Sequence, residues 1–156
     1  MKTIAFFGHR QIYDLHAVQE KVIKTLKDII PQGGANLLIG CHGDFDNIVL
    51  SACLDYKKNI NHDIKIIIVL TSFSFLKKDE YGFSRADFYK EKGCETIFYD
   101  IENVHYKNRI SVSNKRMTED SDLIVCFVDT KSYKSGAKRA VGYAIKQNKK
   151  IINLFY

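Results

Sequence analysis

Short runs of consecutive hydrophobic residues alternate along this chain with longer segments in which hydrophobic residues recur every three or four positions. The runs are predicted to be buried β-strands, and they cover 3–7, 35–39, 64–70, 95–99, 122–128 and 150–155. The periodic segments are predicted to be helices, and they cover 14–30, 45–56, 108–119 and 137–145. Asp14 is placed to cap the first helix, and the fourth strand is short enough to be peripheral.

This alternation of strands and helices is typical of an α/β protein. Strands that are hydrophobic throughout are covered on both faces, which favours a mainly parallel central sheet. Right-handed crossovers between such strands give a three-layer Rossmann-like sandwich. A length of 156 residues fits one domain that covers 1–156.

One segment, 71–93, departs from the alternation and holds six of the chain's 19 aromatic residues. Within it, a helix is expected to begin near Ser84. The segment is either a lid over a ligand or an aromatic connection that packs on the edge of the sheet.

The composition is that of an ordinary soluble protein, with 46% hydrophobic and 27% charged residues. The longest hydrophobic run, 64–70, contains Lys65 and is too short to cross a bilayer. No signal-peptide pattern is present, so a cytoplasmic protein without a membrane partner is expected. The four cysteines are widely spaced, and reduced thiols are expected rather than a zinc site.

The net charge of +6 is concentrated in one part of the chain. Residues 131–150 contain seven basic residues and no acidic one, whereas the remainder is close to neutral. Such a stretch suits a phosphate-bearing ligand or a nucleic-acid backbone, and it is equally typical of a solvated lysine-rich helix face.

The first candidate site follows the first predicted strand, because ligands of parallel sheets bind beyond the carboxyl ends of the strands. Gly8 permits a sharp turn or the close approach of a ligand to the backbone. Arg10 is suited to a phosphate. His9 either donates to an anion or bonds to the backbone of the loop.

The second candidate site follows the second strand and consists of Gly40, Cys41, His42, Gly43, Asp44, Phe45 and Asp46. Two glycines at a strand-to-helix turn allow a ligand to meet backbone amides at the start of a helix. One of Asp44 and Asp46 is expected to cap that helix, and the other to accept from a ribose hydroxyl or a base edge. Both are also candidate catalytic carboxylates. A metal is not expected, because such closely spaced side chains seldom converge on one ion.

The third candidate site is the turn before the last helix. Ser135, Gly136 and Ala137 begin this helix, and its first backbone amides are suited to bind a phosphate. Lysines 131, 134 and 138 surround it. The helix over 108–119 offers Asn114, a polar residue between Ile110 and Met117 on one face. Asn114 either holds a loop or reaches the ligand, and Arg109 either contacts an anion or pairs at the surface.

In this order the segments resemble the SLOG superfamily, and most closely its small stand-alone YpsA-like branch. The resemblance rests on Phe-Phe-Gly-His-Arg at 6–10, Gly-x-x-Gly-x-Phe-Asp at 40–46, Arg-Ile at 109–110 with Asn114 and Met117, and Ser-Gly-Ala at 135–137. It covers nearly the whole chain except 71–93. The resemblance implies a nucleotide-type small-molecule ligand at the strand ends, and self-association into a homo-oligomer, without a cofactor.

The sequence departs from the superfamily's lonely-guy phosphoribohydrolases at the residues that support hydrolysis. Ser113 and Asn114 stand where those enzymes carry an Arg-Lys pair, and Ala140 stands where they carry a glutamate. The resemblance therefore implies binding or sensing of a nucleotide without glycosidase activity. The alternative is a nucleotide N-glycosidase or phosphoribohydrolase that uses Asp44 or Asp46. A weaker alternative, suggested by the related DNA-processing protein A, is single-stranded nucleic-acid binding by the basic stretch.

Overall fold

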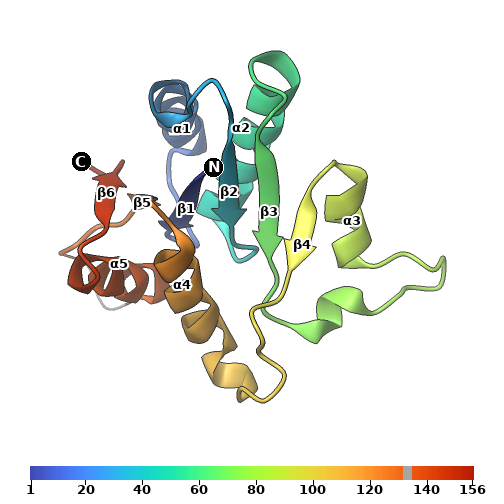
Figure 1. Cartoon of the computed structure of the whole chain (residues 1–156). Coiled ribbons are helices and arrows are strands. Elements are labelled where there is room, and N and C mark those ends of the chain that lie inside the picture. Colours follow the sequence, from blue (N-terminus) through green and yellow to red (C-terminus); the bar gives the residue numbers. More distant parts are fainter. Residues whose placement is uncertain (132–134) are drawn as a thin grey trace.

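The computed structural model describes residues 1–131 and 135–156, and Figure 1 shows the arrangement of their helices and strands. The strands are β1 (Lys2–Gly8), β2 (Ala35–Ile39), β3 (Lys65–Val69), β4 (Glu95–Ile97), β5 (Leu123–Phe127) and β6 (Lys150–Asn153). The α-helices are α1 (Leu15–Ile29), α2 (Asp44–Asn59), α3 (Arg85–Glu91), α4 (Arg109–Asp120) and α5 (Gly136–Lys146). Two short 3-10 helices are η1 (Phe73–Leu76) and η2 (Tyr106–Asn108).

All six strands of the described chain form one parallel sheet in the order β4-β3-β2-β1-β5-β6. The chain winds outward from β1 to β4 and then crosses back to β5, so β1 pairs with β2 on one side and with β5 on the other. Ile4, for example, is opposite Leu37 of β2 and Leu123 of β5. The carboxyl end of β1 is thus the topological switch point at which ligands bind in open α/β sheets.

Helices cover both faces of this sheet, which confirms the three-layer sandwich expected from the sequence (Figure 1). Ile4 and Phe6 of β1 belong to the core formed with α1, α2 and α3. Ala5 and Phe7 point to the other face and pack with α4 and α5. This alternation is the two-residue period of a strand that is buried on both faces.

The starts of two helices follow the expected local chemistry. The Asp14 carboxylate accepts from the backbone N–H of Ala17 at 3.1 Å and caps α1. Ser84 and Asp87 form a reciprocal capping box at the start of α3, which confirms a helix near Ser84.

The last strand ends earlier than the hydrophobic run, at Asn153 instead of Phe155. The ring of Phe155 instead meets that of Phe127 edge to face, with the centroids 5.2 Å apart. The fourth strand is short and lies at the edge of the sheet, as expected. No helix in 1–131 or 135–156 is both long and apolar enough to cross a membrane.

The aromatic segment 71–93 packs against the β4 edge of the sheet. The ring of Phe73 stacks on Phe98 with centroids 4.8 Å apart, and Phe75 is buried in the core. The guanidinium of Arg85 lies 3.7 Å from the centroid of the Phe75 ring. These contacts pack the start and the middle of the segment on the edge of the sheet.

Candidate functional site

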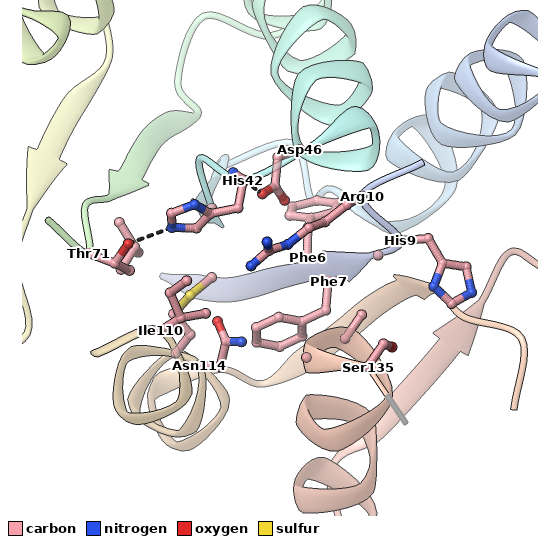
Figure 2. Close-up of a pocket in the computed structure, with 16 residues that line it drawn as sticks. Phe6, Phe7, His9, Arg10, His42, Asp46, Thr71, Ile110, Asn114 and Ser135 are labelled. Atoms are coloured by element: carbon pink, nitrogen blue, oxygen red, sulfur yellow. Dashed lines mark hydrogen bonds between the residues drawn. The ribbon is translucent and has the colours of Figure 1, made fainter. Parts of the chain in front are cut away.

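A cavity of about 210 Å³ opens at the carboxyl ends of β1, β2 and β3, beside α4 and the start of α5 (Figure 2). It lies at the topological switch point, where the sequence places its candidate turns. Most of the expected binding residues line it, namely Gly8, His9, Arg10, Gly40, His42, Asp46, Asn114, Ser135, Gly136 and Ala137. The structure therefore brings the three candidate turns and the face of α4 to one place.

Five expected binding residues do not line this cavity, because each is used in the structure itself. Phe45 is completely buried beneath Gly8. The Asp44 carboxylate accepts from the backbone N–H of Ile12 at 2.9 Å. The Cys41 thiol donates to the carbonyl of Val69 at 3.5 Å.

The remaining two of the five are Gly43 and Arg109. Gly43 has a φ of 145°, and a β-carbon there would meet the α-carbon of Arg10 at 2.6 Å. Arg109 Nε donates to the carbonyl of Val104 at 3.0 Å, and its guanidinium lies 4.9 Å from the centroid of the Phe73 ring. Gly43 is needed where two loops touch, and Arg109 holds the segment before α4.

Several lining residues were not among the expected binding residues, namely Phe6, Phe7, Val69, Thr71, Ile110 and Met117. Ile110 and Met117 share a helix face with Asn114, and that spacing is a signal for the whole face. Thr71 follows the third strand directly, so the rule that placed the other turns also indicates it. Of residues 71–93, only Thr71 lines the cavity.

His9 holds a loop, one of the two roles considered for it. Its Nε2 accepts from the backbone N–H of Asp129 at 2.8 Å, across the turn that follows β5. Its ring meets Phe127 and Phe155 edge to face, with centroids 6.1 and 6.3 Å away. His9 therefore fixes the turn between β5 and α5 against the turn after β1.

His42 is hydrogen-bonded through Nε2 to the hydroxyl of Thr71 at 2.5 Å, as the dashed line in Figure 2 shows. Burial lowers the pKa of His42, and the nearby charges of Arg10 and Arg85 lower it further. The imidazole is therefore neutral at pH 7 and offers the cavity a polar but uncharged edge.

Asp46 is the carboxylate of the cavity. Burial raises its pKa to about 6, although the hydrogen bond from His42 and the charge of Arg10 act in the opposite direction. Asp46 Oδ2 accepts from the backbone N–H of His42 at 2.8 Å. A β-carbon at position 40 would lie 2.8 Å from the same oxygen, so Gly40 makes room for the carboxylate rather than for a ligand.

The expected helix cap at this turn is corrected by the structure. The N-cap of α2 is Gly43, and no side chain caps the helix. Asp44 is instead turned to Ile12, and Asp46 reaches back past the N-cap to His42. Only Asp46 of the two carboxylates faces the cavity.

The start of α5 forms the opposite wall. The Ser135 hydroxyl caps the helix by accepting from the backbone N–H of Lys138 at 3.1 Å. Apart from its chain neighbours and the backbone of its own helix, no described residue has an atom within 4 Å of the Cβ position of Gly136. The first amides of a helix have no partner within it, so Gly136 and Ala137 present N–H groups there. Lys134, also expected near this turn, lies outside the described residues.

Two basic residues of the stretch over 131–150 have different surroundings in the structure. Lys149 Nζ donates to the carbonyls of Glu119 and Ser121, at 3.2 and 2.8 Å, and so binds the end of α4. Arg139, by contrast, lines a second cavity of about 260 Å³ between α4 and α5. Lys149 and Arg139 therefore serve different parts of the molecule.

The sequence matches no known family model and no curated protein. Membership of the SLOG superfamily therefore stays a prediction from the ordered segments. Within the described residues, no group of three or more histidine, cysteine, aspartate or glutamate side chains is arranged to hold a metal ion.

Proposed function

We propose that this protein binds or senses a nucleotide or a nucleotide-derived molecule in the cavity at the carboxyl ends of β1, β2 and β3. The observation that carries the proposal is the division of polar groups within one cavity. Arg10 and the start of α5 supply positive charge and N–H donors, whereas Asp46 supplies an acceptor. A nucleotide has this combination of an anionic group with neutral groups that donate hydrogen bonds.

The phosphate is assigned to the wall formed by Arg10 and the start of α5. The amides of Gly136 and Ala137 have no partner within their helix, and the helix dipole favours an anion there. Gly136 leaves its surroundings open, so a phosphate oxygen can approach the backbone. Arg10 is exposed and adds a planar group with five donors.

The nucleoside is assigned to the rest of the cavity. Arg10 from the loop after β1, Asp46 from α2 and Asn114 from α4 reach toward the same space (Figure 2). Asp46 accepts from a ribose hydroxyl or a base amine, and the amide of Asn114 both donates and accepts. Ile110, which is only partly buried, adds apolar surface for a base.

The resemblance to the SLOG superfamily supports the same ligand class and binding without hydrolysis. Ala140, which takes the place of the glutamate in the lonely-guy enzymes, is a buried residue of α5. Self-association is also proposed from this resemblance, and light scattering during size-exclusion chromatography measures it directly.

Calorimetric titration with the four ribonucleoside 5′-monophosphates tests the phosphate assignment. In Gly136→Val the added side chain occupies the open space at the helix start, and we expect at least about tenfold weaker binding. Gly142→Val is the matched control, because Gly142 is also in α5 with open space and does not line the cavity. Equal nucleotide affinity in the folded Gly136→Val variant and in the parent places the phosphate elsewhere.

The second candidate function is a nucleotide N-glycosidase that uses Asp46. The observation in its favour is a carboxyl group in the cavity with a pKa raised to about 6 by burial. Such a group stabilises positive charge on the ribose or activates water as the base leaves. Chromatography of nucleoside monophosphates after hours with the protein detects free base. Multiple turnovers that are lost in Asp46→Asn and retained in Asp44→Asn establish this function in place of binding alone.

A further inference from the structure

We propose that the second cavity, between α4 and α5, is an anion subsite for the outer phosphates of a nucleotide. The ligand class is then a nucleotide with a chain of at least two phosphates. The inference rests on the proposed function, because it extends the same binding site.

The charge of the second cavity is the first support. Arg10, Lys107, Lys115 and Arg139 line it, and no acidic residue does. The four cations come from the loop after β1, from η2, from α4 and from α5. Four positive charges around one hollow repel one another unless an anion lies between them.

No described acidic residue forms an ion pair with these four cations. The ion pairs found in 1–131 and 135–156 are His16–Glu20, Lys78–Asp87 and Arg116–Asp100. Lys115 lies over the ring of Tyr143, with its ammonium 5.7 Å from the centroid. The hydroxyl of Tyr143 donates to Glu119 at 2.6 Å, which fixes that ring as a wall of the cavity. The positive charge of Lys115 is therefore available to a ligand.

The second cavity continues the first. Both are lined by Arg10, Ile110, Asn114 and Gly136, so the phosphate wall of the first is the boundary between them. The volumes are about 210 and 260 Å³, each below the roughly 300 Å³ at which ligand pockets begin. The combined volume of the two cavities exceeds that limit, which favours one ligand that occupies both cavities.

The two cavities differ in charge, and this sets the direction of the ligand. The first holds both Arg10 and Asp46, whereas the charged residues of the second are all cationic. A nucleoside fits the first, its first phosphate lies at Gly136, and further phosphates extend toward Lys115 and Arg139. A monophosphate reaches only the boundary.

Calorimetric titrations of ribonucleoside 5′-mono-, di- and triphosphates at low salt test this subsite. We expect a diphosphate to bind at least about tenfold more tightly than its monophosphate, because it adds charge-assisted hydrogen bonds. In the double variant Lys115→Gln/Arg139→Gln this ratio falls to about threefold or less. The matched control Lys24→Gln/Lys146→Gln removes the same charge at exposed residues outside both cavities, and it retains the ratio.

The possible outcomes distinguish a failure of the phosphate subsite from a failure of the proposed nucleotide binding. Equal binding of mono- and diphosphates by the parent overturns the subsite and leaves the proposed function standing. Absence of binding by every nucleotide overturns both. A loss of the ratio in the control as well as in the double variant attributes it to net charge and also overturns the subsite.

Two further probes identify the source of the phosphates. In P¹,P²-diadenosine diphosphate two phosphates join two nucleosides. Binding at least as tight as that of adenosine diphosphate supports the subsite. Whichever of the two binds more tightly then shows whether the ligand is a dinucleotide or a nucleoside diphosphate. A single-stranded oligonucleotide that binds more tightly than any nucleotide, and loses that affinity in Lys115→Gln/Arg139→Gln, overturns the proposal in favour of nucleic acid. A steep decrease of its affinity with salt accompanies that result.

Discussion

Gly8 and Phe45 lie so close together that a β-carbon at position 8 would be 2.2 Å from Cγ of Phe45. The sequence suggested that Gly8 permits either a sharp turn or the close approach of a ligand to the backbone. The structure shows that the missing side chain makes room for a fully buried ring of α2. Gly8 thus determines how closely α2 packs against β1, at the floor of the cavity.

Replacement of Gly8 by alanine is expected to destabilise the protein. The new methyl group overlaps the Phe45 ring, and overpacking of this kind costs about 1–3 kcal/mol of unfolding free energy. Urea unfolding measures the change. Gly33→Ala is the control, because no atom lies within 4 Å of its Cβ position. Equal losses in the two variants contradict the packing role of Gly8.

Asp44 and Asp46 are expected to respond differently to alanine. Asp44→Ala removes the acceptor of the Ile12 N–H, so we expect a loss of about 1 kcal/mol in stability with nucleotide affinity retained. Asp46→Ala removes the carboxylate that lines the cavity, so we expect weaker nucleotide binding. Thermal melts and calorimetry separate the two effects. Unchanged binding in both variants removes Asp46 from the site.

The raised pKa of Asp46 predicts the direction in which the free energy of unfolding changes with pH. A carboxyl group whose pKa is about 6 in the folded protein and near 4 when unfolded binds more protons in the folded state. Its stabilising contribution is therefore present below pH 4 and is lost as the pH rises through 6. Asp46→Asn lacks this loss, so we expect it to exceed the parent in stability by about 1–3 kcal/mol at pH 7 and to match it near pH 4.

Unfolding free energies of the parent and Asp46→Asn between pH 4 and 7.5 measure this prediction. The asparagine oxygen still accepts from His42, so the comparison isolates the charge. A difference between the two proteins that does not vary with pH shows that the carboxyl group titrates normally.

Two buried serines, Ser113 within α4 and Ser121 at its C-cap, are expected to give stability changes of opposite sign when replaced by alanine. Ser113 has a buried hydroxyl with no hydrogen-bond partner among the described residues, whereas the buried hydroxyl of Ser121 donates to the carbonyl of Met117. Ser113→Ala removes an unsatisfied polar group and should stabilise the protein by about 1 kcal/mol, and Ser121→Ala should destabilise it by a similar amount. Chemical denaturation of the pair measures both signs. A destabilised Ser113→Ala indicates that its hydroxyl is satisfied in solution.

The fold could be predicted from the sequence because its signals are local. Strands hydrophobic on both faces, such as Ile4–Phe7, specify a covered parallel sheet without knowledge of their neighbours. Asp14 and Ser84 mark helix starts through hydrogen bonds that span only three residues. The end of the last strand was missed because it depends on Phe127, a distant partner of Phe155.

The candidate site could be predicted as a set of turns but not as individual contacts. The rule about strand ends located the turns, yet it did not distinguish Asp44 from Asp46. Which carboxylate faces the cavity depends on the backbone of Ile12 and on the space beside Gly40, both set by tertiary packing. The cationic hollow between α4 and α5 depends on residues far apart in sequence, and no motif marks it.

The central position of β1 has a consequence during synthesis. Its second neighbour, β5, begins at Leu123, more than 100 residues after β1 leaves the ribosome. Until then one edge of β1 has no strand to pair with, and an open edge of this kind recruits other chains. The sheet at the floor of the cavity therefore closes only after β5 has been synthesised, and nascent chains stalled before β5 expose an unpaired strand edge that can associate with other chains.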